Sequence, residues 1–364
     1  MRHSPRRRRS AAVAAFAALL LTAATACGGS DDTDDSGASG GSEGSGDSGS
    51  QGSAEAGAFP VTLDGRFGET TIEEEPERIV TVGLTDQDAV LALGKVPVGT
   101  TDWLSLHDAA IGPWAEEALG DADRPEMLTD PGTGPQVEAI AELQPDLILA
   151  VYSGLTQDQY DNLSQIAPVV TAPEGVPDWG VAWEDQTRII GTALGQPERA
   201  DELIEGVEAT FAEAREAHPE FDGQTGVVAT PWEGNYAYGS NDPRSQLLAG
   251  LGFSIPQELD DVIGDDFGAT ISRERTDLFD QSVAVWLVGD TETAPDELHG
   301  DALYGDLDVV TEGREIFVNE TSDLGAAFSF GTVLSLPYTV EHLAPLLSAA
   351  VDGDPATAVE TPAE

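Results

Sequence analysis

Short apolar runs alternate with segments of helical spacing in two regions of the chain. The apolar runs, each expected to form a buried strand, cover residues 78–83, 96–100, 147–151 and 169–171 in the first region and 226–230, 283–288 and 316–318 in the second. Apolar residues recur every three or four positions, as in amphipathic helices, over residues 86–93, 136–143, 157–166, 244–251 and 333–351. Strands that alternate with helices predict parallel sheets covered on both faces, so we expect two doubly wound α/β lobes.

A long helix is predicted between the two regions, over residues 197–217. Its apolar face is marked by residues three or four positions apart, which are Leu203, Ile204, Val207, Phe211 and Ala214. Pro197 suits the first turn of a helix, Pro219 follows its end, and a helix of this length spans about 30 Å. Because the α/β pattern stops before this segment and resumes after it, we interpret the helix as a single rigid connection between two lobes. The alternative is one more surface helix of a single domain.

The first 26 residues have the features of an export signal. Arg2 and the arginines at 6–9 precede an uncharged segment, residues 11–26, that is too short to span a membrane comfortably. The segment ends in Ala24-Thr25-Ala26, directly before the only cysteine, Cys27. This arrangement resembles the bacterial lipobox, whose cysteine receives a lipid, although Ala24 stands where lipoboxes usually have leucine. We expect an exported protein, lipid-anchored through Cys27 on the outer face of the cytoplasmic membrane; the alternative is an ordinary secretory signal with an incidental cysteine.

Composition divides the rest of the chain. Residues 27–57 are rich in Gly, Ser, Asp and Glu and bury too little apolar surface to fold, so we expect a disordered tether there. The parts expected after it are an N-terminal α/β lobe over 58–196, the connecting helix over 197–218, a C-terminal α/β lobe over 219–351 and a disordered tail over 352–364. A single cysteine excludes disulfide bonds within the chain, so stability must come from packed cores.

The chain is strongly acidic. It contains 67 Asp and Glu residues against 16 Lys and Arg residues, a net charge of −51. Removal of residues 1–26, which contain five arginines, would change this charge to −56. Such a charge repels nucleic acid and anionic lipid headgroups, so we expect no nucleic acid partner. It also keeps a protein soluble in high salt, which indicates either a saline environment or a bias of the whole lineage.

The sequence lacks the usual motifs of catalysis and of metal binding. Within the two predicted lobes no Gly-X-Ser-X-Gly elbow, His-Glu-X-X-His pair or phosphate loop of the Gly-X4-Gly-Lys type occurs. The histidines of the body, His107, His218, His299 and His342, have no paired spacing on one helix or hairpin. We therefore expect neither an enzyme nor a metal ion held by the protein itself.

Several short segments follow one another in a specific order between residues 59 and 350. They are Pro76-Glu77-Arg78-Ile79-Val80, Asp88-Ala89, Leu91-Ala92-Leu93-Gly94, Pro97-Val98-Gly99, Thr101-Asp102-Trp103, Val137-Glu138-Ala139-Ile140, Leu143-Gln144-Pro145-Asp146-Leu147-Ile148, Tyr152-Ser153-Gly154-Leu155-Thr156, Ile166-Ala167-Pro168-Val169-Val170, Ile190-Gly191, Ile271-Ser272-Arg273-Glu274 and Leu334-Ser335-Leu336-Pro337-Tyr338. In joint order and spacing the chain resembles the iron–siderophore-binding proteins of ATP-driven importers, a branch of the helical-backbone solute-binding proteins. The resemblance implies the class III periplasmic-binding-protein fold.

The resemblance also implies a mechanism. Two lobes face each other across a cleft, the connecting helix limits their movement to small tilts, and a monomeric protein carries a ferric siderophore to an ABC permease dimer with its ATPase. Family members use one acidic residue per lobe to meet permease arginines, and the matching positions are Glu138 and Glu274. Two alternatives stay open: a receptor of the same fold for a corrinoid or haem, and a surface sensor or interaction protein that no longer serves transport.

A ferric siderophore calls for aromatic walls and a few donors at the carboxyl ends of the strands. The residues expected there are Trp103, Tyr152, Ser153, Trp232, Tyr236, Tyr238, Arg244 and Phe328, the last in a loop with Phe330 before the final helix. Trp103 could instead be a packing residue, and Arg244 could pair with Asp242 rather than with ligand oxygens. Arg188 is expected in a structural ion pair and Trp183 in the core. Because the body is acidic, we expect a neutral or cationic hydroxamate complex rather than a strongly negative catecholate complex.

Overall fold

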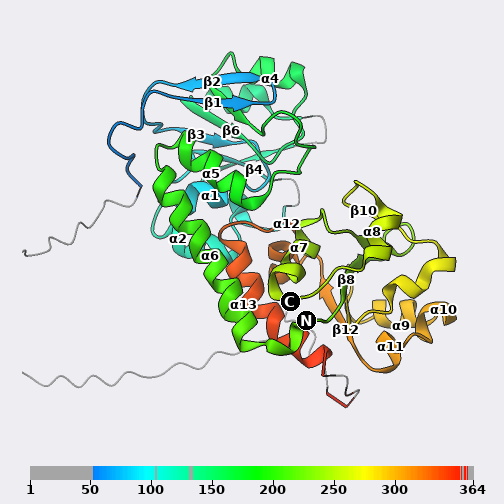
Figure 1. The fold of residues 1–364 in the computed structure, drawn as a ribbon. Coiled ribbons are helices and arrows are strands. Elements are labelled where there is room, and N and C mark those ends of the chain that lie inside the picture. Colours follow the sequence, from blue (N-terminus) through cyan, green and yellow to red (C-terminus); the bar gives the residue numbers. More distant parts are fainter. Residues whose placement is uncertain are drawn as a thin grey trace, which may run out of the picture. The chain divides into compact units, whose positions relative to one another are not determined.

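Two separate five-stranded sheets organise the residues that the computed structural model describes, which are 52–102, 105–130, 134–352, 354, 356, 357 and 359. These residues belong to one compact unit, Gly49–Glu364. In Figure 1 each sheet lies at the centre of one lobe, with helices around it. The predicted signal peptide, Cys27, most of the predicted tether and Trp103 lie outside the described residues.

The sheet of the N-terminal lobe is entirely parallel, as the alternating pattern predicted. Its strands, in the order β5-β4-β3-β6-β7, are β5 (Glu126–Thr129), β4 (Gly99–Asp102), β3 (Ile79–Thr81), β6 (Leu147–Ala150) and β7 (Val169–Thr171). The helices of this lobe are α1 (Asp86–Ala92), η1 (Asp108–Ala110), η2 (Pro113–Ala115), α2 (Glu116–Leu119), α3 (Val137–Glu142), α4 (Gln157–Leu163) and α5 (Trp183–Ala193). An antiparallel hairpin of β1 (Val61–Gly65) and β2 (Gly68–Ile72), which the apolar pattern did not predict, joins the β7 edge, where Thr70 Oγ1 donates a hydrogen bond to the Val169 carbonyl at 2.7 Å.

The sheet of the C-terminal lobe is mixed, which differs from the expected parallel sheet. Its order is β10-β9-β8-β11-β12. The strands β8 (Gly226–Thr230), β11 (Val283–Val288) and β12 (Glu315–Asn319) pair in parallel, whereas β9 (Tyr236–Tyr238) is antiparallel to both of its neighbours, β8 and β10 (Gly268–Thr270). The helices around it are η3 (Pro219–Phe221), α7 (Pro243–Leu251), α8 (Gln257–Ile263), η4 (Arg273–Phe279), α9 (Ala294–His299), α10 (Ala302–Gly305), α11 (Asp308–Thr311), α12 (Asp323–Phe330) and α13 (Ser335–Ala350). The chain turns back into β9 only five residues after β8, too short a distance for the helical crossover that a parallel strand requires.

The predicted connecting helix is present as α6 (Pro197–Ala217). It packs against α5 of the N-terminal lobe and against α7 and α13 of the C-terminal lobe. Two glycines allow this close approach, because an added Cβ at Gly191 of α5 would lie 2.4 Å from the Ala200 Cβ, and one at Gly250 of α7 would lie 2.9 Å from the Phe211 ring. The main apolar core accordingly includes residues from both sheets together with Val207 and Phe211 of α6.

The last residues of the predicted tether are held by the N-terminal lobe. The backbone N–H of Glu55 donates to the carbonyl of Gly195 at 2.7 Å. Its carboxylate accepts a hydrogen bond of 2.8 Å from the N–H of Glu198, in the first turn of α6. No side chain within α6 caps this turn, so Glu55 satisfies a donor that the helix start leaves free. In the predicted tail, Val359 packs against the main core.

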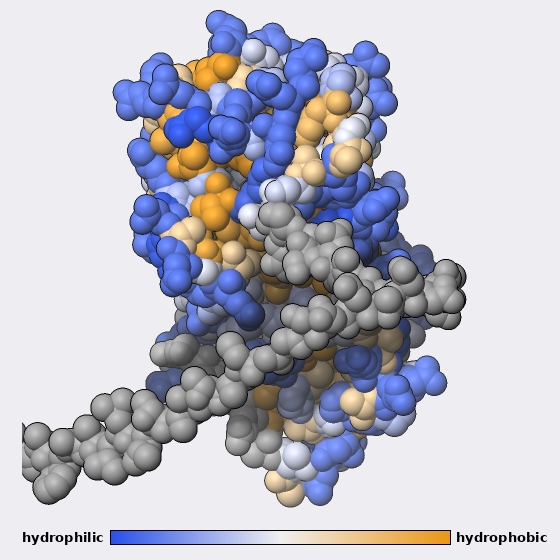
Figure 2. All heavy atoms as spheres, turned by 90° about the vertical axis from the view of Figure 1, so that its left-hand side faces the viewer, coloured by the Kyte–Doolittle hydropathy of each residue, from blue (hydrophilic) through white to orange (hydrophobic). Residues whose placement is uncertain are grey.

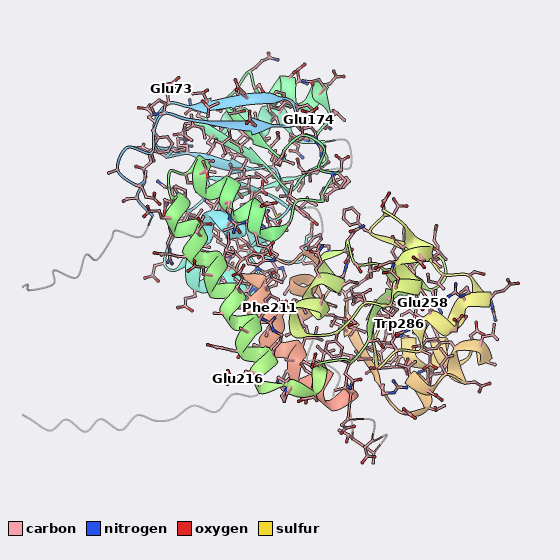
Figure 3. The ribbon with its side chains drawn as sticks, in the orientation of Figure 1. Glu73, Glu174, Phe211, Glu216, Glu258 and Trp286 are labelled. Carbon is pink, nitrogen blue, oxygen red and sulfur yellow. The ribbon has the colours of Figure 1, made fainter. Side chains whose placement is uncertain are left out.

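Charged residues cover the outside of this unit. Figure 2 shows hydrophilic residues over most of the face that it presents, with apolar residues in smaller patches. In Figure 3, Glu73 and Glu174 of the N-terminal lobe and Glu216 at the end of α6 are exposed, whereas Phe211 and Trp286 are buried. Of the helices in the described part of the chain, none combines the length and the apolar composition needed to cross a bilayer.

The packing of α6 can be tested with two neighbouring substitutions. Ile204 is 2% exposed on α6, and its neighbour Glu205 is exposed. We expect Ile204→Ala to lower the free energy of unfolding by about 2–5 kcal/mol, because a buried side chain is replaced by a cavity. Glu205→Ala is the control and should change it by no more than about 0.5 kcal/mol. Chemical denaturation followed by circular dichroism measures both, and equal effects would show that α6 is not anchored through its apolar face.

Candidate functional site

One wall of the candidate site lies at the carboxyl ends of the N-terminal strands. A cavity of about 720 Å³ is lined there by residues that follow β3, β5 and β6, and by Phe330 at the end of α12. The lining residues include Tyr152 and Ser153, the second and third residues after β6, and Trp179. Because Phe330 comes from the C-terminal lobe, this cavity belongs to a cleft between the two lobes.

A buried carboxylate holds the Tyr152 backbone in place. Asp86, at the start of α1, accepts hydrogen bonds from the N–H groups of Val151 at 2.8 Å and Tyr152 at 3.0 Å. It also accepts one from the Gln186 side chain of α5 at 2.8 Å. Burial raises the pKa of Asp86, and these hydrogen bonds oppose that rise. The loop after β6 is therefore fixed to two helices of its lobe before any ligand arrives.

The second wall lies at the carboxyl ends of β8, β11 and β12. A cavity of about 370 Å³ is lined by Thr230, Pro231, Trp232, Tyr238, Gly289 and Glu320. Trp232 is 63% exposed. The rings of Trp232 and Tyr236 are 5.9 Å apart, and those of Tyr236 and Tyr238 are 5.3 Å apart in edge-to-face geometry. Three aromatic side chains thus form a continuous row on the C-terminal side.

Arg244 is tied to this row and to a carboxylate. Its Nε and Nη2 each donate to the Asp242 carboxylate at 2.7 Å, and its Cζ lies 3.8 Å from the centre of the Tyr238 ring. Burial raises the pKa of Tyr152 to about 12, an effect that the negative charge of Asp242 increases and the positive charge of Arg244 opposes. The charges of the C-terminal lobe therefore reach a tyrosine of the opposite lobe.

The structure brings several of the predicted residues to the two walls. Tyr152 and Ser153 line the first wall, Trp232 and Tyr238 line the second, and Tyr236 lies beside them. The alternative that paired Arg244 with Asp242 is the arrangement found. The structural ion pair expected for Arg188 is present, with Asp201 at 2.9 Å. Trp183, expected in the core, is half-buried at its edge.

The loop expected around Phe328 is instead the helix α12, begun by Ser322, whose hydroxyl accepts a hydrogen bond from the Gly325 N–H at 3.1 Å. Phe328 is 1% exposed and packs in the main core, so its assignment to the cleft does not agree with the structure. Phe330, two residues later and at the helix end, lines the cleft. The Gly and Ser content of this segment made a helix look like a loop.

Trp179 lines the cleft although the sequence patterns did not select it. It is 47% exposed and has a φ of 54°, in the left-handed region that bulky residues rarely adopt. Its ring lies directly on Gly154, where an added Cβ would come within 2.8 Å of the ring. Trp179 lies in a loop, where no periodic pattern marks it. The one sequence signal is Gly154, directly after Tyr152-Ser153, because a glycine at a strand end can indicate a bulky side chain packed against the backbone.

Glu138 and Glu274 are both exposed. Glu138 lies in the first turn of α3, three residues after Pro135, which lines the N-terminal wall. Glu274 is the second residue of η4, four residues after the end of β10, whose Thr270 pairs with Tyr236. Within the described residues, no group of three or more His, Cys, Asp or Glu side chains is arranged to hold a metal ion.

A family model described as "Periplasmic binding protein" matches residues 79–320, more than half of the 364 residues. The chain belongs to the periplasmic binding protein family. The family and the α/β fold that the sequence motifs predicted are therefore confirmed.

Solved structures and a curated sequence are similar to this periplasmic binding protein. A periplasmic solute-binding protein from Mycobacterium smegmatis is 31% identical, with a TM-score of 0.71 over 80% of this chain and 98% of that one. PiaA from Streptococcus pneumoniae, solved in complex with ferrichrome, is 32% identical, with a TM-score of 0.70 over 81% and 99% of the two chains. The Fe(3+) dicitrate-binding periplasmic protein FecB of Escherichia coli is 27% identical over 206 residues, 55% of this chain. The chain spans 63% of the length of that curated relative.

The two lobes of this periplasmic binding protein also meet at a polar contact. Asp88 of α1 accepts hydrogen bonds from Trp114 Nε1 at 2.8 Å and from the hydroxyl of Thr332, before α13, at 2.5 Å. Among the described residues its other oxygen, Oδ1, has no hydrogen-bond partner. Burial raises the pKa of Asp88 to about 6, while these hydrogen bonds and the charge of His107 oppose the rise. His107 itself pairs with Asp323 of the other lobe at 3.0 Å.

This contact predicts a pH dependence of stability. The pKa of Asp88 rises on folding from 3.8 to about 6, so protonated Asp88 stabilises the folded state. This contribution to the free energy of unfolding is complete below pH 3.8 and is lost as the pH rises through 6. Between pH 5 and pH 7.5 we expect a loss of about 1.4 kcal/mol through this group. Asp88→Asn can accept the same two hydrogen bonds and does not titrate, so it should lack this component. Denaturant unfolding at both pH values measures this loss. Asp158→Asn, a substitution of an exposed residue on α4, is the control and should keep the wild-type pH dependence. An unchanged pH dependence in Asp88→Asn would contradict the prediction.

Proposed function

We propose that this protein captures a ferric siderophore between its lobes, outside the cytoplasmic membrane, and delivers it to an ABC importer. The observation that carries the proposal is the pair of aromatic walls at the carboxyl ends of both sheets, with Tyr152 on one side and Trp232, Tyr236 and Tyr238 on the other. Two walls of this kind suit a bulky chelate whose exterior mixes apolar groups with oxygen atoms. PiaA, similar over nearly all of its length, was solved with such a chelate, ferrichrome.

The charge of the walls favours a neutral or cationic complex. The described residues that line the two cavities include the acids Asp130 and Glu320 and no Lys, Arg or His. The guanidinium of Arg244, which lies against Tyr238 of the second wall, already pairs with Asp242 through two hydrogen bonds. A catecholate complex with several negative charges would meet no unpaired cation, whereas a hydroxamate complex would not need one. We therefore propose a ferric hydroxamate as the ligand.

Delivery would use the exposed carboxylates Glu138 and Glu274, one on each lobe. Each follows a segment that contributes to its cleft wall, and neither has an ion-pair partner within 4 Å in the described part of the chain. Charges at a rim steer encounter and fix orientation more than they add affinity. The proposal includes a lipid on Cys27 and a monomeric protein that meets a permease dimer, with its ATPase, at the membrane surface.

Ligand binding by the purified chain tests the proposal. Titration calorimetry with ferrichrome should give saturable binding, and Trp232→Ala should weaken it about three- to tenfold because one aromatic contact is lost. Leu303→Ala removes an apolar side chain of similar exposure from α10, away from the cavities, and should have no effect. Failure of every ferric chelate to bind would overturn the function. Binding of a ferric triscatecholate without any hydroxamate would overturn only the ligand preference.

Uptake by cells tests the docking assignment separately. Glu138→Arg combined with Glu274→Arg should abolish uptake of the labelled iron complex, because both rims would repel the permease arginines. Affinity for the complex in solution should not change, since neither residue lines the cavities. The matched control combines Glu142→Arg on α3 with Glu258→Arg on α8, both exposed. Uptake that is normal in the first variant, or lost equally in the control, would contradict the assignment.

A further inference from the structure

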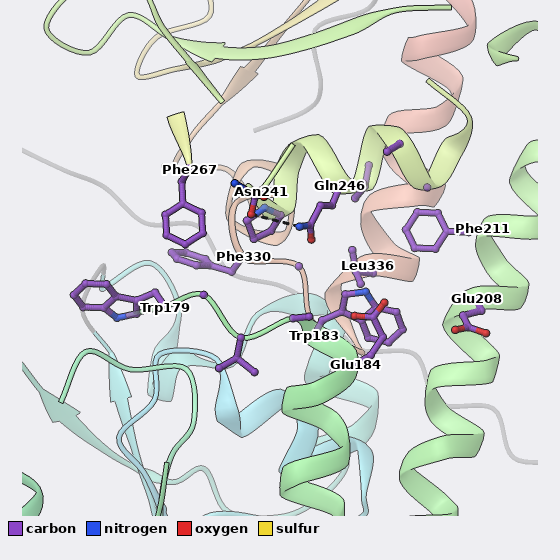
Figure 4. Close-up of a pocket in the computed structure, with 18 of the residues that line it drawn as sticks. Trp179, Trp183, Glu184, Glu208, Phe211, Asn241, Gln246, Phe267, Phe330 and Leu336 are labelled. Atoms are coloured by element: carbon purple, nitrogen blue, oxygen red, sulfur yellow. Dashed lines mark hydrogen bonds between the residues drawn. The ribbon is translucent and has the colours of Figure 1, made fainter. Parts of the chain in front are cut away.

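A third cavity lies between the lobes, next to α6 (Figure 4). Its volume is about 550 Å³. The lining comes from the loop before α5 and its first turn, from one face of α6, from α7 and from the end of α12. Of the described residues that the sequence predicted for ligand binding, none lines it.

The cavity adjoins the cleft. Trp179 and Phe330 line both this cavity and the cavity of the N-terminal wall. In Figure 4 their rings lie at one end, beside Phe267, while Glu208 and Phe211 of α6 lie at the other end. A ligand bound between the walls could therefore extend a side arm past Trp179 and Phe330 toward α6. We call this third cavity the side pocket.

The side pocket combines aromatic faces with carboxylates. Five aromatic residues line it, which are Trp179, Trp183, Phe211, Phe267 and Phe330. Glu184 of α5 and Glu208 of α6 line it toward the end away from Trp179. Within the described residues neither carboxylate has a Lys, Arg or His partner within 4 Å. Burial raises the pKa of Glu184, and the charges of Asp185 and Glu208 add to that rise.

The arginines near the side pocket are already engaged. Arg188, whose charge opposes the rise in the Glu184 pKa, pairs with Asp201 at 2.9 Å. Arg215 lines the pocket but donates to the carbonyl of Gly250, on α7. It is seven residues from Glu208 along α6, about 10 Å by helix rise. Among the residues that the structure describes, no cation therefore neutralises Glu184 and Glu208 at their end of the pocket.

We propose that the side pocket accepts an ammonium group carried on an arm of the ligand, an inference that rests on the proposed function. An ammonium ion is attracted to aromatic faces and forms strong hydrogen bonds with carboxylates. A metal ion fits the pocket less well, because no cluster of three metal-ligating side chains occurs in the described residues. The substrate class is then a ferric hydroxamate with a free amine at the end of a flexible chain.

Two chelates that differ only in this charge test the inference. A linear ferric trihydroxamate with a terminal primary amine, and its N-acetylated form, are titrated into the purified full chain by calorimetry. The wild type should bind the amine form about tenfold more tightly. Glu184→Gln combined with Glu208→Gln should bring this ratio to about one while leaving the affinity for the acetylated form unchanged, which also shows that the variant is folded. Added salt should reduce the wild-type ratio.

The control variant combines Glu205→Gln and Glu213→Gln, which are exposed on α6 and do not line the pocket. It should keep the wild-type ratio. Equal binding of both forms by the wild type would overturn the inference and leave the proposed function standing, as would a tenfold ratio that persists in the Glu184–Glu208 variant. If neither form binds and ferrichrome does not bind either, the proposed function itself fails.

Discussion

The close packing of α6 against one helix from each lobe is the constraint on which the rest of the structure depends. Ala200 meets Gly191 of α5, and Phe211 meets Gly250 of α7, with no room for a Cβ at either glycine. Because both contacts lie on one straight element, they fix the spacing of the two sheets. The facing strand ends, and with them Tyr152 and Trp232, owe their separation to this helix.

Much of the fold could be predicted where apolar runs have clear ends. β7, β8, β11 and α6 have the predicted bounds, since a polar residue, glycine or proline lies within two residues of each end. The β1–β2 hairpin was missed because its residues are half exposed and its burial alternates. β9 and β10 are three residues long, below the length at which periodicity can be recognised, and they change the sheet from parallel to mixed.

In the candidate site, only the residues at the ends of predicted strands could be predicted from the sequence. Tyr152, Ser153, Trp232 and Tyr238 directly follow or neighbour strands, and the carboxyl ends of a sheet meet at one edge. Phe328 and Phe330 lie on different sides of α12. Their positions could not be predicted, because the sequence of this segment was interpreted as a loop rather than as a helix. Trp179 depends on a left-handed backbone conformation and on contact with Gly154, neither of which leaves a periodic signal.

The hydrogen bond from the Glu198 N–H to the Glu55 carboxylate fixes the point at which the chain before Glu55 joins the folded unit. That point is the N-terminal end of α6, beside Gly195, and not the mouth of the cleft. Because Ala54 and Glu55 also donate hydrogen bonds to Glu75 and Gly195, the preceding chain is attached to the N-terminal lobe, next to α6. A tension applied through this attachment would therefore act on a single lobe and would not by itself separate the two walls of the cleft.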